Sequence, residues 1–166
     1  MSQLARAFVA SALLALVPCR SNAQLPLPSL GVVGGVSQYH LNGSGSTPFG
    51  ALRIDIPLMS LVADGSVGLF RPNENGVHRT YIIPEAQLQF QLLPILIRPY
   101  IGIGGGWFTA LSGPDPHKSV MTGSASAGVR AGIPLTPLRF RAEVRTRGIG
   151  SGFHSGATEW TLGIGW

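Results

Sequence analysis

The chain has 166 residues, of which only 11% are charged, and it contains 23 Gly, 13 Pro and a single Cys. This length suits one domain, but an ordinary soluble protein has about 25% charged residues, so the composition fits a water-facing exterior poorly. The formal net charge of +5 comes mainly from Arg residues. Because these Arg residues alternate along predicted strands and do not cluster, the charge does not indicate a nucleic-acid-binding protein.

Residues 1–23 have the pattern of a secretory signal peptide. Arg6 supplies the positive charge, the segment 8–17 is apolar, and small residues end the segment. We therefore expect export, followed by a mature barrel domain at 24–166.

The single cysteine lies inside this leader. Cleavage after Ala23 would remove Cys19 and leave the mature chain without thiol or disulfide chemistry. The alternative is a lipoprotein signal in which Cys19 is lipidated, although Pro18 stands where that pattern has a small residue.

The remainder of the chain alternates between apolar and polar residues in short segments. Alternation places successive side chains on opposite faces of a strand. The clearest case is 138–147, where every second residue is charged. The strands expected in chain order are 31–41, 49–56, 60–71, 80–92, 96–108, 121–133, 138–147 and 159–166.

The connections between these strands are of two kinds. Short ones with Pro are expected at 57–59, 93–94 and 134–137; longer polar ones at 42–48, 72–78, 112–118 and 148–156. Eight strands of about 8–13 residues bracket the length needed to cross a bilayer at a tilt. Short turns at one end and long loops at the other are typical of an up-and-down membrane barrel with both termini in the periplasm.

Alternation alone does not say which face is inside, since a soluble lipocalin-type barrel is apolar inside. The polar face here carries both charge signs and much Gly and Ser, which suits a narrow filled interior. Aromatic residues near strand ends suggest girdles at the membrane interfaces, at Tyr39, Trp107, Trp160 and Trp166. With Glu143 at its centre, the expected lumen ionic network is Arg53, Asp55, Asp64, Glu85, Arg98, Arg130, Arg139, Arg141, Glu143, Arg145, Arg147 and Glu159.

The leader, the eight alternating segments and the final aromatic residue resemble the small outer-membrane β-barrel proteins of Gram-negative bacteria. This family includes the membrane domain of outer membrane protein A. The most specific motif is an assembly signal in the last strand, which Glu159, Ile164 and Trp166 match, whereas Thr161 stands where Gly is common. The resemblance implies an all-β, eight-stranded antiparallel transmembrane barrel, inserted as a monomer by the barrel-assembly machinery and in contact with outer-membrane lipid.

The resemblance also bears on catalysis. Small barrels that remove acyl chains from lipids use a His and a Ser two positions apart on a lipid-facing strand, and the late strand here lacks that pair. His154 and Ser155 are adjacent in a Gly-rich loop. We therefore predict a side-chain-plugged barrel with a structural or surface-interaction role, no cofactor and no turnover chemistry. The alternatives are a narrow pore gated by lumen ion pairs, a lipid-modifying enzyme and a soluble ligand-binding barrel.

Two sets of side chains are expected at the outer end of the barrel. The histidines each fall in or beside a different long loop, and we expect solvated residues there, with a shared zinc ion as the alternative; they are His40, His78, His117 and His154. The cations could pair with lipopolysaccharide phosphates; they are Arg71, Arg79, Lys118 and Arg147.

Overall fold

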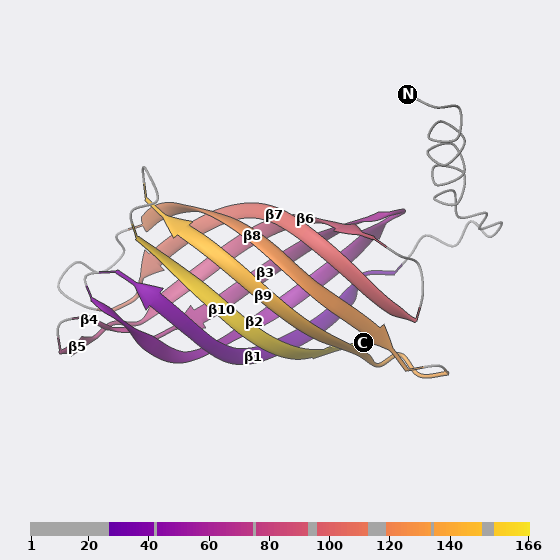
Figure 1. Cartoon of the computed structure of the whole chain (residues 1–166), viewed down its shortest axis with the longest axis horizontal. Coiled ribbons are helices and arrows are strands. Elements are labelled where there is room, and N and C mark those ends of the chain that lie inside the picture. Colours follow the sequence, from indigo (N-terminus) through magenta and orange to yellow (C-terminus); the bar gives the residue numbers. More distant parts are fainter. Residues whose placement is uncertain are drawn as a thin grey trace, which may run out of the picture.

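The computed structural model describes residues 27–41, 43–74, 76–92, 96–112, 119–133, 135–150 and 155–166. Eight strands form one closed antiparallel barrel in the order β1-β10-β9-β8-β7-β6-β3-β2 (Figure 1). They are β1 (Ser29–His40), β2 (Ser44–Leu58), β3 (Leu61–Phe70), β6 (Tyr81–Gln91), β7 (Ile97–Ala110), β8 (Ser119–Gly132), β9 (Arg139–Ile149) and β10 (Ser155–Gly165). In the ranges that the structure describes, no helix is long and apolar enough to cross a membrane.

The two ends of the barrel differ. One end, the loop end, carries the connections β1–β2, β3–β6, β7–β8 and β9–β10; the other, the turn end, carries β2–β3, β6–β7 and β8–β9 together with the start of β1 and the end of β10. A small hairpin of β4 (Asn73–Glu74) and β5 (Val77–His78) projects from the loop end, at the left of Figure 1. At the turn end, Met59 has φ 59°, as a tight two-residue hairpin turn requires.

The expected loop at 42–48 is wrong. Ser44 to Pro48 continue β2 and pair with the last residues of β1, so the connection between these strands is only 41–43. Gly45 permits this pairing, because a Cβ atom there would lie 2.8 Å from the hydroxyl of Tyr39. The Gly- and Ser-rich composition predicted a loop, but pairing with β1 makes these residues the first part of β2.

The hydrogen-bonded register fixes the tilt of the strands. Directly paired residues lead from Leu30 through Ile54, Gly65, Ala86, Gly105, Gly123, Gly148 and Gly156 back to β1 at His40. The path returns 40 − 30 = 10 residues further along the strand. This stagger in eight strands corresponds to a tilt within the 35–45° common for barrels, with an interior just wide enough for side chains.

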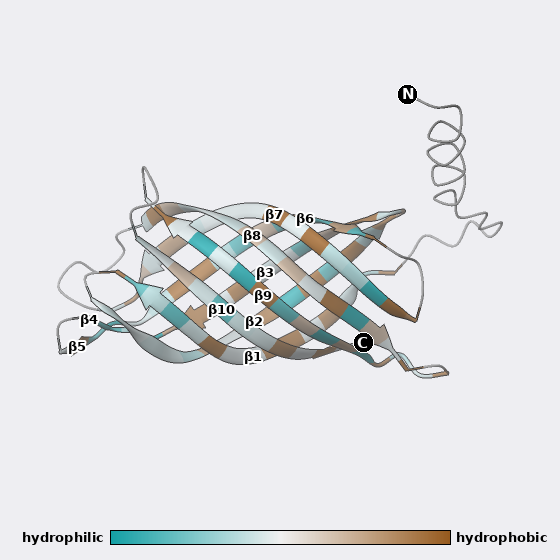
Figure 2. Cartoon of the chain, in the orientation of Figure 1, coloured by the Kyte–Doolittle hydropathy of each residue, from teal (hydrophilic) through white to brown (hydrophobic). Residues whose placement is uncertain are grey.

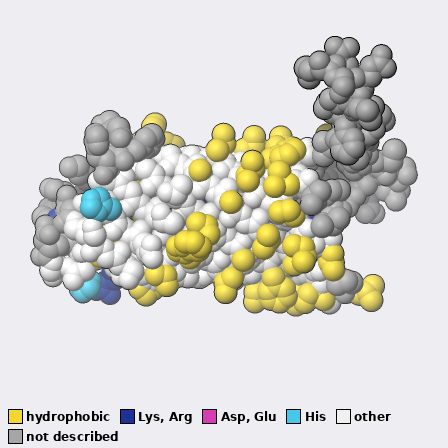
Figure 3. All heavy atoms as spheres, in the orientation of Figure 1, with side chains coloured by type: hydrophobic (Ala, Val, Ile, Leu, Met, Phe, Trp, Pro, Cys, Tyr) yellow, Lys and Arg dark blue, Asp and Glu magenta, His cyan; other side chains and the backbone are white. Residues whose placement is uncertain are grey.

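The sequence alternation maps onto the two faces of the barrel wall. On β9, Glu143 is 4% exposed and Arg145 1%, whereas the outward Phe140 is 45% exposed. Brown and teal segments alternate along the strands in Figure 2. On the face shown in Figure 3, hydrophobic side chains gather toward the turn end and histidines lie toward the loop end. The barrel is thus polar inside and apolar outside over much of its length.

Three of the four expected girdle aromatics lie on the outer face: Trp107, Trp160 and Trp166 are all more than half exposed. Tyr39 was assigned to the wrong face. Its side chain points inward and packs edge-on against Phe70, with ring centroids 5.6 Å apart.

Candidate functional site: the filled barrel interior

The interior is occupied by a network of ion pairs between strands that are distant in the sequence. Its ten members, called the ionic network below, are Arg53, Arg130, Arg141, Arg145, Arg147, Asp55, Asp64, Glu85, Glu143 and Glu159. Within these ten described residues, five positive charges balance five negative charges. Because an unpaired charge is very costly away from water, this pairing is the condition for burying them.

Glu143 lies at the centre of the ionic network. Arg53 donates two hydrogen bonds to its carboxylate, from Nη1 to Oε2 at 3.0 Å and from Nη2 to Oε1 at 2.7 Å. Arg145 Nε donates to Oε1 at 3.0 Å, and the hydroxyl of Tyr100 donates to Oε2 at 2.5 Å. Four charge-assisted bonds hold this carboxylate, and the two from Arg53 form the bidentate geometry that guanidinium and carboxylate groups favour.

Asp64 on β3 joins three arginines. Arg141 Nη1 donates to it at 2.8 Å, Arg145 Nη2 at 3.4 Å and Arg53 Nη1 at 3.5 Å. Asp64 is 2% exposed. One acidic side chain therefore links β2 and β9 from the strand next to β2.

The network extends in both directions from this centre. Toward the loop end, Glu85 binds Arg145 at 2.7 Å and also Arg147, which in turn donates to Glu159 at 3.1–3.2 Å. Toward the turn end, Asp55 accepts from Arg130 at 3.3 Å and from Arg141. The ion pairs thus run from the turn end through the middle of the barrel.

Glycines on β7 make room for a second polar group. Gln87 on β6 reaches over this strand to β8, donating to Ser124 at 2.8 Å and accepting from Ser126 at 2.9 Å. A Cβ atom at Gly102 would lie 2.9 Å from Ser126 Oγ, and one at Gly104 would lie 2.3 Å from the carbonyl oxygen of Ala86. The Gly residues at alternate positions on β7 are therefore a packing requirement.

An apolar layer fills the interior at the loop end. Phe70 is 1% exposed and contacts three aromatic rings, with centroid distances of 5.6 Å to Tyr39, 6.3 Å to Tyr81 and 5.7 Å to Phe108. The layer also contains Phe49, Ile83, Ile149 and Ala157. Edge-to-face aromatic contacts of this kind add to the free energy of apolar burial. The interior is therefore polar and charged from the turn end to the middle, and aromatic at the loop end.

Most residues expected in the lumen network meet there, including the centre at Glu143. One does not: Arg139 is exposed at the turn end. Arg98 is half-buried at the same end. Tyr100, Gln87 and the aromatic layer were not expected as part of the filling. Alternation places them on the inner face, but which of them meet depends on the stagger of the barrel.

The remaining predicted residues that the structure describes lie partly on the surface and partly inside the barrel. Ile164 and Trp166 of the expected assembly signal face outward, while Glu159 points inward and binds Arg147. His40 and His78 are exposed, and His40 Nδ1 lies 2.5 Å from Ser44 Oγ. His117, His154 and Lys118 lie outside the described residues, as do the proposed leader and Cys19. Arg147 was wrongly placed among the outer cations, since it is 3% exposed.

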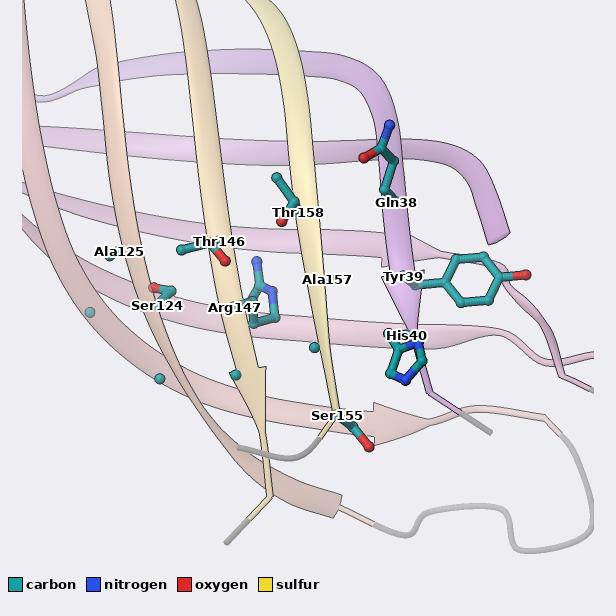
Figure 4. A pocket seen from close by; sticks show the side chains of 14 residues that line it. Gln38, Tyr39, His40, Ser124, Ala125, Thr146, Arg147, Ser155, Ala157 and Thr158 are labelled. Atoms are coloured by element: carbon teal, nitrogen blue, oxygen red, sulfur yellow. The ribbon is translucent and has the colours of Figure 1, made fainter. Parts of the chain in front are cut away.

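The chain has a broad open depression of about 760 Å³ near the loop end, over β1, β8, β9 and β10 (Figure 4). Gln38, His40, Thr146 and Thr158 line it together with glycines. Within the described parts of the chain, no group of three or more His, Cys, Asp and Glu side chains is arranged to hold a metal ion.

No protein-family model matches this chain, and no curated protein sequence matches it significantly. Its structure is similar to that of Neisserial surface protein A, with a TM-score of 0.71 and 13% identity, over 83% of this chain and 95% of the other. It is also similar to Ail, the attachment invasion locus protein of Yersinia pestis, with a TM-score of 0.54, 16% identity, and coverage of 83% and 95%. The chain therefore shares its closed, eight-stranded antiparallel barrel fold with these two proteins.

Proposed function

We propose that this chain is a small integral outer-membrane barrel with a structural or surface-interaction role and no turnover chemistry. The filled interior supports this proposal. The ionic network occupies it from the turn end to the middle, and the aromatic layer occupies the loop end. Both carboxylate oxygens of Glu143 and Glu85 are held by guanidinium groups, so neither is available as a general base.

The outer face fits a lipid environment. Leu162 and Ile103, which lie within strands, are 71% and 72% exposed. In lipid, every backbone polar group needs an internal partner, and a closed barrel leaves no strand edge open. We therefore place the turn end and both chain termini in the periplasm and the loop end outside, after export directed by residues 1–23.

A surface role is supported by the exposed side chains at the loop end and by the names of the two similar proteins, a surface protein and an attachment invasion locus protein. Arg71, His40 and His78 are exposed there. We propose that Arg71 contacts lipopolysaccharide phosphates, because guanidinium groups pair well with phosphate. We further propose that the barrel is a monomer, and that its assembly machinery recognises the strand ending at Trp166.

The competing function is a narrow pore gated by the lumen ion pairs. Planar-bilayer recordings of the purified, refolded barrel separate the two functions. We expect no steady conductance from the natural chain, because a current would have to pass both the ionic network and the aromatic layer. Steady channels that are altered by Glu143→Ala would contradict the plugged barrel.

The membrane location has its own test. Membrane fractionation, followed by gel electrophoresis in detergent with and without boiling, is expected to show an outer-membrane protein whose migration changes on heating. A barrel that stays soluble without detergent would contradict the proposed location and support a soluble ligand-binding barrel.

A further inference from the structure

The inner wall at the turn end carries arginines on three adjacent strands. Arg98 on β7 is the direct cross-strand partner of Arg130 on β8, and Arg130 is the partner of Arg141 on β9. Arg139 follows at the start of β9. Like charges placed directly opposite each other on neighbouring strands destabilise a sheet. Such a row needs negative charge nearby.

Two acidic side chains of the ionic network meet this row. Asp64 accepts from Arg141 at 2.8 Å, and the two carboxylate oxygens of Asp55 are already engaged by Arg130 and Arg141. Arg130 also donates to Gln89, and its guanidinium plane lies over the Tyr100 ring at 4.3 Å from the centroid. These contacts involve Nη2 and the flat face of the Arg130 guanidinium group. They do not involve the edge formed by Nε and Nη1.

That other edge is buried and has no partner. Among the described residues, Nε and Nη1 of Arg130 and Nε of Arg53 are buried without a hydrogen-bond acceptor. Arg130 is 8% exposed and Arg53 is 5% exposed. Leaving a charged donor unpaired away from water is unfavourable. All three groups are cationic N–H donors, so an occupant that satisfies them must be an acceptor, and a negative charge suits them best.

Both arginines line the same cavity at the turn end. It measures about 30 Å³ and is also lined by Asp55, Arg139 and Arg141. A water molecule needs roughly 10–15 Å³ of such space, so the cavity has room for about two or three atoms of that size. Arg139 is exposed and adds a cation that solvent can reach.

We propose that the turn-end mouth of the barrel binds a small phosphate-class oxyanion, with one anionic oxygen in the cavity between Arg53 and Arg130 and the rest of the ion toward Arg139. Guanidinium groups pair well with phosphate oxygens. In the orientation proposed above, this mouth opens to the periplasm, away from the surface-interaction end. The site is therefore independent of a surface role and of whether the lumen conducts.

Inorganic phosphate and the full barrel, refolded in detergent, provide the test. A ligand that binds only the folded state stabilises it by mass action. At constant ionic strength, phosphate at about 100 times its dissociation constant is expected to lower the unfolding equilibrium constant about 100-fold. Urea unfolding followed by tryptophan fluorescence measures this shift, and broadening of the phosphorus-31 resonance of phosphate measures binding directly.

Two variants localise the effect. Arg139→Gln removes an exposed cation that is not part of the ionic network, so we expect the barrel to fold and the phosphate affinity to fall about tenfold. Arg71→Gln removes one positive charge at the opposite end, where the lipopolysaccharide contact is proposed, and is expected to leave the phosphate affinity of the turn-end cavity unchanged. If phosphate gives no shift in the natural barrel, the cavity holds water and the proposal is wrong. An equal loss in both variants would show non-specific electrostatics and would also overturn it.

Discussion

Arg53 on β2 and Glu143 on β9 share two parallel hydrogen bonds of 3.0 and 2.7 Å inside the barrel, although 90 residues separate them in the chain. Both side chains are at most 3% exposed. β10 and β1 lie between the two strands in the barrel. The pair thus connects two strands, β2 and β9, that share no backbone hydrogen bond. The side chains of the interior therefore add contacts across the barrel to those of the backbone.

Removing the charge of Glu143 should destabilise the barrel strongly. Glu143→Gln leaves Arg53 and Arg145 with an uncharged acceptor in place of their carboxylate, and breaking a buried pair costs about 3–5 kcal/mol. Urea unfolding of the barrel in lipid vesicles measures this change. Arg71→Gln, at an exposed cation, is the control and should change the free energy of unfolding by less than about 0.5 kcal/mol. Equal unfolding midpoints for the two variants would contradict a stabilising ionic network.

Coupling between the two residues should appear in a double-mutant cycle. Arg53→Met together with Glu143→Gln removes both charges, so the pair of changes should cost less than the sum of the single changes by about 1–3 kcal/mol. The double variant should still be less stable than the natural barrel, because Glu143 also accepts hydrogen bonds from Arg145 and Tyr100. Strict additivity would mean that the close approach of the two groups contributes nothing.

The aromatic layer should be sensitive to loss of volume. Phe70→Ala leaves a cavity beside Tyr39, Tyr81 and Phe108, and such a change typically costs about 3–5 kcal/mol. Phe90→Ala is the matched control, because this ring faces outward and is 39% exposed, so lipid can fill the space. Thermal unfolding in detergent measures the loss of stability of each variant relative to the natural barrel. A larger loss for Phe90→Ala would place the main packing on the outside.

Close backbone packing around β7 should make one glycine irreplaceable. A Cβ atom at Gly106 would lie 2.1 Å from the carbonyl oxygen of Pro84, while one at Gly132 would meet nothing within 4 Å. Gly106→Ala should therefore cost at least the 1–3 kcal/mol of ordinary overpacking, and Gly132→Ala should be nearly neutral. The fraction of protein showing heat-modifiable migration after refolding measures both. Equal refolding of the two variants would contradict the packing requirement.

A charge on the outer face reports contact with lipid. Ile103 lies in the middle of β7, and Ile97 begins the strand at the turn end. Ile103→Arg is expected to cost about 2–4 kcal/mol and Ile97→Arg about 0–1 kcal/mol, as for depth-dependent insertion of Arg into a bilayer. Unfolding from vesicles measures the difference. If the barrel spans the membrane, Ile103→Arg must cost more than Ile97→Arg. Equal costs would contradict contact between the middle of β7 and lipid.

The strands and their polarity could be predicted because alternation is a local signal with a period of two. In the segment Leu138–Arg147 it identified the inner and outer faces of β9 correctly from Phe140 to Arg147. The boundary of β2 could not be predicted from the Gly- and Ser-rich segment before Phe49, because its strand state comes from pairing with β1. Local composition gives no information about a partner strand.

The contacts inside the barrel were harder to predict. Arg53 meets Glu143, and Phe70 meets Phe108, only because the strands close with a stagger of ten residues between Leu30 and His40. That stagger depends on the register of every strand pair together. The aromatic layer was missed for the same reason, since its members lie on the polar face of their strands and near the strand ends.

The equality of five positive and five negative charges in the ionic network has a consequence for how such a chain changes over generations. A single substitution that removes one of these charges leaves the ionic network with a net charge of one unit, and removal of Arg147 also takes away the guanidinium group that binds Glu159. Substitutions that preserve stability should then occur as pairs that keep the charge balanced, such as loss of Arg147 together with loss of Glu159. Outward apolar residues, by contrast, can exchange one at a time. Divergence in relatives of this chain should therefore be gradual on the lipid face and stepwise inside the barrel.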